Sequence, residues 1–247
     1  GGIIQINLLI DTIFASLLET GSPTWLYVSD RLIQFPMGIF AIAIGTVLLP
    51  TLSKFDLDYE KDKFIAGIQK GQKFVLYIGL PSLIGLFFCA EDLISTIFYR
   101  GAFSSMDVIN SSYSLMAFSF GLPFFMLMKV LTPAFFARKD TKTPMYVALA
   151  SLFLNVIFNY YLAFVLDYGH VGIAIGSSLA AIISVLTLEI VLYRDGFIKS
   201  KSILSKFSFN VFISILFLII FLYFYTSEID FMKLTQVERI FYLSIEV

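Results

Sequence analysis

The chain has 247 residues, of which 58% are hydrophobic and 14% charged, and its mean hydropathy is +0.88. These values exclude an ordinary soluble domain, which could not keep so many long apolar runs out of water. A single Cys excludes an internal disulfide, and a single His alongside it leaves no cluster of Cys and His metal ligands. The net charge of −1 excludes little, because it averages a basic rim and an acidic one.

Apolar runs of bilayer length define the predicted transmembrane segments. The alternation of apolar and polar residues that marks outer-membrane strands is absent, so we expect helices. The predicted fold class is an all-α integral membrane protein, a helical bundle of seven spans with an eighth beginning near Ile240. The seven spans are predicted at residues 3–19, 25–50, 68–90, 112–136, 144–166, 170–193 and 208–226.

Basic residues predict the orientation of these spans. Twelve Lys and Arg residues fall in three alternating connections, within residues 54–73, 138–142 and 194–206, whereas the opposite side has three near span ends. The positive-inside rule places those three connections in the cytoplasm of a bacterium, and the protein as a multi-pass component of its cytoplasmic (inner) membrane. Because this topology already accounts for the basic residues, the sequence gives no support for nucleic-acid binding.

A basic connector divides the chain. We predict a six-span lobe at residues 1–194, a basic cytoplasmic linker at 195–207 and an appended transmembrane helix pair at 208–247, with its last helix truncated. The chain has no initiating Met and opens directly into an apolar span. We therefore expect it to be the later part of a longer protein.

Arg31 and Asp30 lie inside the apolar span 25–50. A guanidinium persists in a bilayer only where protein or cavity water solvates it, so this pair predicts an anion-binding cavity. Tyr27 before the pair and Gln34 after it are at helical spacings that bring them onto adjoining faces. Two structural interpretations remain open: Asp30 forms an ion pair with a neighbour, or Arg31 reaches the membrane interface near Trp25.

Lys129 is a second cation inside a predicted span, between Pro123 and Pro133. Prolines free backbone carbonyls, so the helix is expected to be irregular there. We take Lys129 as a candidate substrate-binding residue. The alternative is that its side chain extends to the cytoplasmic headgroups.

Polar oxygens also recur at membrane depth in the first, fifth and sixth spans. At spacings of four residues they share helical faces, and carboxylate and amide oxygens suit a small hard cation such as Na⁺. The alternative is hydrogen bonding between helices. These residues are Asn7, Asp11, Asn155, Asn159 and either Ser177 or Ser178.

Three ordered segments resemble the MurJ/MviN family of lipid II flippases. They span the first 145 residues, approximately, and their order makes the resemblance specific. The segments are Ser29–Leu32 with Phe35–Gly38 and Ala43–Ser53, then Tyr99–Phe103, and finally Lys129–Phe136 with Asp140–Pro144.

This resemblance implies the fold of the multidrug/oligosaccharidyl-lipid/polysaccharide (MOP) exporters: two six-helix lobes around a central cavity, followed here by two further helices. The chain would be the second lobe plus most of the helix pair, with the missing first lobe and membrane lipids as its partners. The implied activity is movement of lipid II from the inner to the outer leaflet by alternating access, without enzyme chemistry. Rival functions are export of another lipid-linked oligosaccharide, cation-coupled drug export and a noncatalytic membrane scaffold.

The resemblance also implies roles for individual residues. Arg31 corresponds to a cavity arginine that would bind pyrophosphate, and Asp30 would hold Arg31 or exchange partners with the substrate. Gln34 stands where many relatives have an acidic residue. The sites at which some relatives are thought to coordinate sodium correspond to Asp11, Asn155 and Asn159, with an amide at 159 in place of a carboxylate. Coupling would use a Na⁺ gradient or the membrane potential, and no cofactor is implied.

Overall fold

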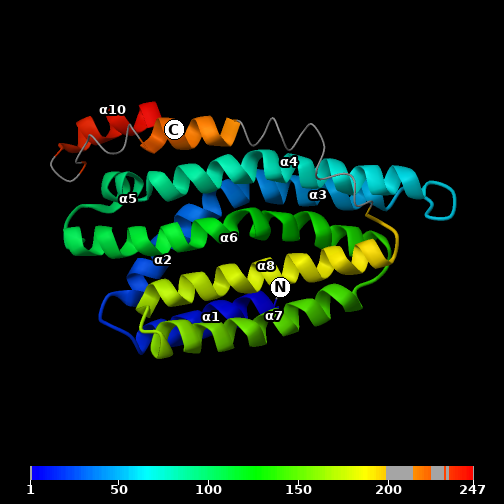
Figure 1. The fold of residues 1–247 in the computed structure, drawn as a ribbon, viewed down its shortest axis with the longest axis horizontal. Coiled ribbons are helices and arrows are strands. Elements are labelled where there is room, and N and C mark those ends of the chain that lie inside the picture. Colours follow the sequence, from blue (N-terminus) through cyan, green and yellow to red (C-terminus); the bar gives the residue numbers. More distant parts are fainter. Residues whose placement is uncertain (1, 199–213, 224–230, 232–233, 247) are drawn as a thin grey trace.

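The structure is a computed structural model that describes residues 2–198, 214–223, 231 and 234–246. Figure 1 shows long helices lying side by side along one axis, and every regular element within the described residues is helical. Five helical segments are long and apolar enough to cross a membrane. The predicted all-α membrane class is confirmed. The five segments are Ser22–Leu52, Lys61–Phe88, Ser105–Ala137, Lys142–Val165 and Gly169–Arg194.

The helices follow the predicted order, with three unpredicted elements. These are the short helix α5, a π-helical segment that interrupts the second span and another that ends the fifth. The elements are α1 (Gly2–Ser16), α2 (Ser22–Pro36), η1 (Met37–Ala41), α3 (Ile42–Leu52), α4 (Lys61–Phe88), α5 (Ala90–Phe98), α6 (Ser105–Ala137), α7 (Lys142–Tyr160), η2 (Tyr161–Val165), α8 (Gly169–Arg194), a helix at Ser214–Tyr223, and α10 (Gln236–Glu246).

The span predicted at 25–50 is built from three pieces. Helix α2 ends at Pro36, the π-helix η1 follows, and α3 completes the crossing. Proline has no N–H to donate and its ring crowds the preceding turn, so a regular α-helix is interrupted near it. This break lets the two halves of one span face different neighbours.

Helix α4 begins at Lys61, seven residues before the predicted start of its span. The sequence from Lys61 to Lys73 is too polar for a bilayer window, but Phe64, Ile65 and Ile68 recur at helical spacing and are buried. An amphipathic stretch of this kind stays helical because one face packs on the protein. The helix therefore begins before the predicted membrane span, and the start of the span itself stays a prediction.

Helix α6 forms the centre of the lobe and packs against α2, α3, α4, α5 and α8. Leu115, Leu122, Met126 and Leu131 on this helix are fully buried. By contrast, Phe153 on α7 is 65% exposed, as expected for an apolar side chain that faces lipid. In Figure 1, α6 and α8 lie between α3 and α4 on one side and α1 and α7 on the other.

Two of the family-like segments are connections between helices. Gly101 has a φ of +62° in the turn between α5 and α6, a conformation that glycine adopts without steric cost. Before α7, the Asp140 carboxylate accepts hydrogen bonds from Thr143 Oγ1 at 2.6 Å and from Thr143 N at 3.0 Å. These bonds lower the pKa of Asp140 below its ordinary value. Both segments therefore build turns and helix starts.

The appended pair is described in part. The predicted linker at 195–207 lies mostly outside the described residues, and the span predicted at 208–226 is described as a helix over Ser214–Tyr223. The last helix begins at Gln236, after a capping interaction in which Glu238 Oε2 accepts from Thr235 N at 2.8 Å. Helix α10 packs against α5, where Arg239 Nη1 donates to Ser95 O at 3.1 Å. The division at residues 194 and 207 stays a prediction.

Candidate functional site

A cavity of about 230 Å³ lies between α1, α2, α6 and α8. Helix α1 contributes Asn7 and Asp11, α2 contributes Tyr27 and Asp30, and α8 contributes Ser177. Thr12, Met37 of η1 and apolar side chains from all four helices form the rest of the wall. We call this space the polar cavity, because two carboxylates from separate helices line it.

Asp11 is the centre of a hydrogen-bond cluster. Asn159 Nδ2 donates to Asp11 Oδ1 at 2.6 Å, and Ser177 Oγ lies 3.4 Å from Asp11 Oδ2. Asn155 Nδ2 donates to Ser177 Oγ at 2.9 Å, and Asn159 Nδ2 also lies 3.0 Å from Asn155 Oδ1. The structure thus assembles four of the residues that the sequence selected. Asn7 and Ser178 are not among them: Asn7 Oδ1 has no hydrogen-bond partner among the described residues, and the Ser178 hydroxyl donates to Ala117 O at 3.0 Å.

Helix packing holds this cluster together. Asn155 and Asn159 are fully buried on α7, which packs against both α1 and α8. Gly176 lies against the Asn159 side chain, and a Cβ added at Gly172 would meet Ala163 N of η2 at 2.7 Å. Small residues let helix backbones approach closely inside a membrane. The four-residue spacing of these glycines therefore seats α8 on α7 and η2.

The donor set of this cluster fits a hard cation. Two amide oxygens, Asn7 Oδ1 and Asn159 Oδ1, are buried without a hydrogen-bond partner among the described residues. A buried acceptor that lacks a donor is costly, and a cation would satisfy it. Asp11 and Ser177 add further oxygens, and oxygen is the ligand type that a hard cation such as Na⁺ prefers. Hydrogen bonding between helices, the alternative interpretation, also occurs in the same cluster.

Asp30, Gln34 and Arg31 form a chain of contacts on the adjacent face of α2. Gln34 Nε2 donates to Asp30 Oδ2, and Arg31 Nη1 donates to Gln34 Oε1 at 3.3 Å. The guanidinium of Arg31 also lies over the Tyr27 ring, 4.6 Å from its centroid. No ion pair joins Asp30 to Arg31 within the described part of the chain. Asp30 therefore contacts Arg31 through Gln34, and its role in holding Arg31 stays a prediction.

The two ends of this contact chain differ in exposure. Asp30 is partly buried and lines the polar cavity, whereas Arg31 is exposed and does not line it. Arg31 thus lies beside the polar cavity, exposed at the surface of the lobe, and the prediction that it faces a cavity between two lobes stays untested. A carboxylate and a guanidinium on one helix consequently face different surroundings.

Lys129 is separate from this group. It is partly buried on α6, it does not line the polar cavity, and no hydrogen bond or ion pair joins it to Asp30, Gln34 or Arg31 in the structure as described. Its backbone carbonyl lies against α3, where a Cβ added at Gly45 would meet Lys129 O at 3.1 Å. The structure therefore does not unite the four predicted substrate-binding residues in one cavity.

Sequence reasoning did not predict the hydrogen bonds that join α2 to α6. Ser29 Oγ donates to Ser111 O of α6 at 2.7 Å, and Trp25 Nε1 donates to Asp107 Oδ1 at 2.7 Å. Asp107 also forms a capping box with Ser104 at the start of α6. The Ser-x-x-Asp pattern before an apolar run is a signal for that cap, but nothing in the sequence links it to Trp25.

Comparison with known proteins agrees with this architecture. The family described as lipid II flippase MurJ matches residues 1–242. The chain belongs to the MurJ family. That family consists of transporters rather than enzymes, and membership together with the multi-span fold makes this an integral protein of the inner membrane.

Individual relatives support the same family. A probable lipid II flippase MurJ of Vibrio cholerae is 43% identical over 192 residues, which are 78% of this chain and 36% of the relative. One from Haemophilus influenzae is 42% identical over 190 residues, covering 74% of this chain and 37% of the relative. The chain therefore spans less than half the length of these relatives.

Comparison with solved structures identifies the fold. A lipid II flippase MurJ in an inward closed conformation has a TM-score of 0.77 and 28% identity, over 99% of this chain and 49% of that one. A MATE transporter in a bent conformation has a TM-score of 0.68 at 16% identity, over 91% of this chain and 49% of that one, and shows the fold alone. The predicted similarity to one lobe of a MOP-type transporter is confirmed.

Proposed function

We propose that this chain is the second lobe of a transporter that moves lipid II from the inner to the outer leaflet. The observation that carries the proposal is the exposed guanidinium of Arg31 on a membrane-spanning helix. Its hydrogen bonding to the described residues is a single contact of 3.3 Å to Gln34. A guanidinium has five N–H donors in a planar fork, so most remain available for a pyrophosphate. The names of the relatives support lipid II as the substrate.

Gln34 links Arg31 to Asp30 and leaves the guanidinium able to bind an anion. Its amide accepts from Arg31 while donating to Asp30, so the carboxylate orients the guanidinium without neutralising it through a direct ion pair. When pyrophosphate binds Arg31, the Gln34 amide keeps its bond to Asp30. We expect Asp30 and Gln34 to act as positioning residues and Arg31 as the ligand-binding residue.

The transport cycle needs the rest of the protein. In the proposed cycle the first lobe supplies the opposite wall of a central cavity, and rocking of the two lobes exposes this cavity to each side in turn. No covalent step is required, because the substrate crosses unchanged. Arg31 would bind the pyrophosphate while the lipid tail remains in the bilayer.

The Asp11 cluster is proposed as the coupling site. A bound Na⁺ would supply a positive charge that the cluster binds in one conformation and releases in another. The unpartnered oxygens of Asn7 and Asn159 support this assignment. The membrane potential is the alternative energy source, since one charge crossing it gains about 2.3 kcal/mol per 100 mV.

The test of the substrate site uses the complete protein in cells depleted of their own flippase. Lipid II exposed at the outer face is measured for wild type, Arg31→Ala, Arg31→Lys and the matched control Arg194→Ala, all at equal expression. We expect wild type and the control to restore exposure, Arg31→Ala to fail, and Arg31→Lys to restore part of it, because Lys lacks the planar fork. Full activity of Arg31→Ala would refute the role of Arg31, and inactivity of the wild type would favour another lipid-linked oligosaccharide.

The coupling site has its own test. Thermal unfolding of the complete protein is compared in Na⁺ and K⁺ for wild type, Asp11→Asn and the exposed control Glu19→Gln. Since a ligand that binds only the folded state stabilises it, we expect Na⁺ to raise the midpoint for wild type and Glu19→Gln only. Equal midpoints in the two salts for wild type would leave the membrane potential as the energy source.

A further inference from the structure

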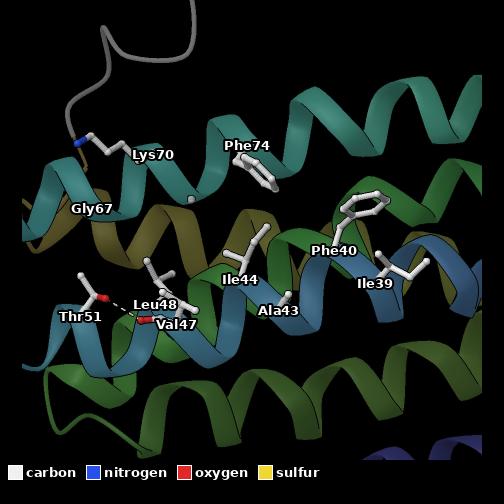
Figure 2. Close-up of a pocket in the computed structure, with 11 residues that line it drawn as sticks. Ile39, Phe40, Ala43, Ile44, Val47, Leu48, Thr51, Gly67, Lys70 and Phe74 are labelled. Carbon is white, nitrogen blue, oxygen red and sulfur yellow. Dashed lines mark hydrogen bonds between the residues drawn. The ribbon is translucent and has the colours of Figure 1, made fainter.

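A second cavity lies between η1, α3 and α4 (Figure 2), and its lining residues come later in the Ser22–Leu52 span than those of the polar cavity. Its volume is about 450 Å³. Ile39, Phe40, Ala43 and Val47 line one side, and Phe74 lines the other, with their side chains directed into the space between the helices. We call this space the α3–α4 groove. Its wall is almost wholly apolar.

The length of the groove matches one leaflet of a bilayer. Ile39 and Thr51 mark its two ends along the span and are twelve residues apart. That separation corresponds to roughly 18 Å of helix, and half of a hydrocarbon core is roughly 15 Å. The Thr51 end belongs to the connection predicted to be cytoplasmic. The groove therefore follows the inner leaflet from the middle of the membrane to the cytoplasmic surface.

One cation lies at the cytoplasmic end. Lys70 is the charged residue in the groove wall, it is exposed, and Figure 2 shows its ammonium at the Thr51 end, away from Phe40. Neighbouring lysines have partners: Lys63 pairs with Glu60 at 2.6 Å, and Lys61 donates to Asp195 O at 3.3 Å. Lys70 forms no ion pair within the described ranges of the chain.

The other polar group in the wall needs no ligand. Thr51 Oγ1 donates to Val47 O of its own helix at 2.8 Å, so the hydroxyl is satisfied. An occupant must therefore be apolar over the length of the groove and anionic at its cytoplasmic end. A protein helix would not generally combine these properties, whereas an acyl chain with a phosphate headgroup does.

We propose that the α3–α4 groove binds one anionic phospholipid of the inner leaflet, with an acyl chain along Val47 and Phe74 and the phosphate at Lys70. Juxtamembrane lysines attract anionic headgroups, and the cytoplasmic leaflet is the one that presents them. The occupied groove would hold α3 against α4 through a lipid. This site does not depend on the proposed transport of lipid II.

The test places a photo-crosslinking residue in the groove of the complete protein. Val47→p-benzoylphenylalanine is compared with Tyr146→p-benzoylphenylalanine on α7, since Val47 and Tyr146 are 67% and 63% exposed. Tyr146 lies one turn from Lys142 and does not line the groove, so it reports the effect of a surface lysine alone. The bilayer contains equal amounts of phosphatidylglycerol and phosphatidylethanolamine, and lipid adducts are identified by mass.

We expect about a fivefold excess of phosphatidylglycerol adducts at position 47, the order of effect of one lysine near the surface. At position 146 the excess should be clearly smaller. Lys70→Gln should bring the ratio at position 47 close to one, whereas Lys142→Gln should leave it unchanged. An equal ratio at the two positions would overturn the proposal, because both would then report ordinary lipid contact.

Two further measurements distinguish the effect of the groove's shape from the effect of the Lys70 charge, and identify the molecule that the groove binds. Ala43→Phe fills the groove and should reduce the phosphatidylglycerol excess with Lys70 intact, whereas Ala66→Phe, exposed on α4 outside the groove, should not. In native membranes, phosphatidylglycerol or another anionic phospholipid on position 47 supports the proposal. A polyprenyl adduct, or a crosslink to another part of the protein, would overturn it.

Discussion

The polar cavity and the α3–α4 groove are built on the same membrane span, yet their chemistry is opposite. Tyr27 and Asp30 of α2 line the first, and Ile39 to Thr51 of η1 and α3 line the second. The π-helix η1 lies between them and contributes Met37 to the first and Ile39 and Phe40 to the second. A continuous α-helix would keep one angular pattern of side chains along the whole span. The helix interruption thus lets one span line a polar cavity in one half and an apolar groove in the other.

The two cavities also differ in how they are held. Around the polar cavity, side chains from α1, α7 and α8 exchange hydrogen bonds, with Asp11 and Asn159 as the link between the first and the fifth spans. Around the groove, contact is apolar, and a Cβ added at Gly71 would meet Val130 Cγ1 at 3.0 Å. We therefore expect substitutions near the polar cavity to cost more stability than substitutions in the groove.

The largest expected effect is at the glycine that seats α8 beside the polar cavity. A Cβ in Gly172→Ala would lie 2.7 Å from Ala163 N and Leu162 C of η2, so backbone must move. We expect a loss of about 2–3 kcal/mol, as for other overpacked sites. The measurement is unfolding of the complete protein in detergent. Gly85→Ala is the control, since nothing lies within 4 Å of its added Cβ, and an equal loss there would refute the packing argument.

A smaller effect is expected at the hydrogen bonds of the same cavity. Asn155→Leu conserves size but removes the donor to Ser177 Oγ and the acceptor for Asn159 Nδ2. Since hydrogen bonds between helices in membranes contribute modestly, we expect a loss of about 1 kcal/mol in the same unfolding measurement. Thr187→Val, which removes a 2.7 Å bond to Ile183 O of its own helix, should cost less. Stability unchanged by Asn155→Leu would mean that the cluster serves ligand binding alone.

The smallest effect is expected in the groove. Thr51→Val removes only a bond to the same helix, so its stability should stay within about 0.5 kcal/mol of wild type. Ser177→Ala, the matched hydroxyl deletion in the polar cavity, should be the more destabilising of the two, because Ser177 bonds to both Asn155 and Asp11. The reverse order, measured by unfolding of both variants side by side, would break the contrast between the cavities.

Much of the candidate site was predictable because helical spacing identifies shared faces. The four-residue intervals from Asn7 to Asp11 and from Asn155 to Asn159 correctly selected residues that the structure brings together. Lys129 shows the limit of the same logic. Its position in an apolar run predicts that it lies in the membrane, but not which neighbouring helix it contacts. In the structure its backbone carbonyl lies against Gly45 of α3, and Lys129 does not line the polar cavity with Asp30.

Gln34 shows a different limit of sequence reasoning. It stands where an acidic residue was expected, so it looked like a weakened site. In the structure its amide both donates to Asp30 and accepts from Arg31, which a carboxylate cannot do. The contacts of Gln34 with both neighbours, rather than its departure from the family pattern, therefore indicate its role.

The sequence alone determined the membrane class, the order of the spans and the polar face of each helix. A bilayer demands about twenty apolar residues for each crossing and leaves polar groups only where they are solvated, and both demands are readable along the chain. Only the tertiary structure decided which faces meet, where the Ser22–Leu52 span breaks, and that Arg31 lies outside the polar cavity. Lipid is as apolar as the side chains it touches, so hydrophobicity gives helices no preferred partner. Close packing at small residues and hydrogen bonds between distant segments make that choice.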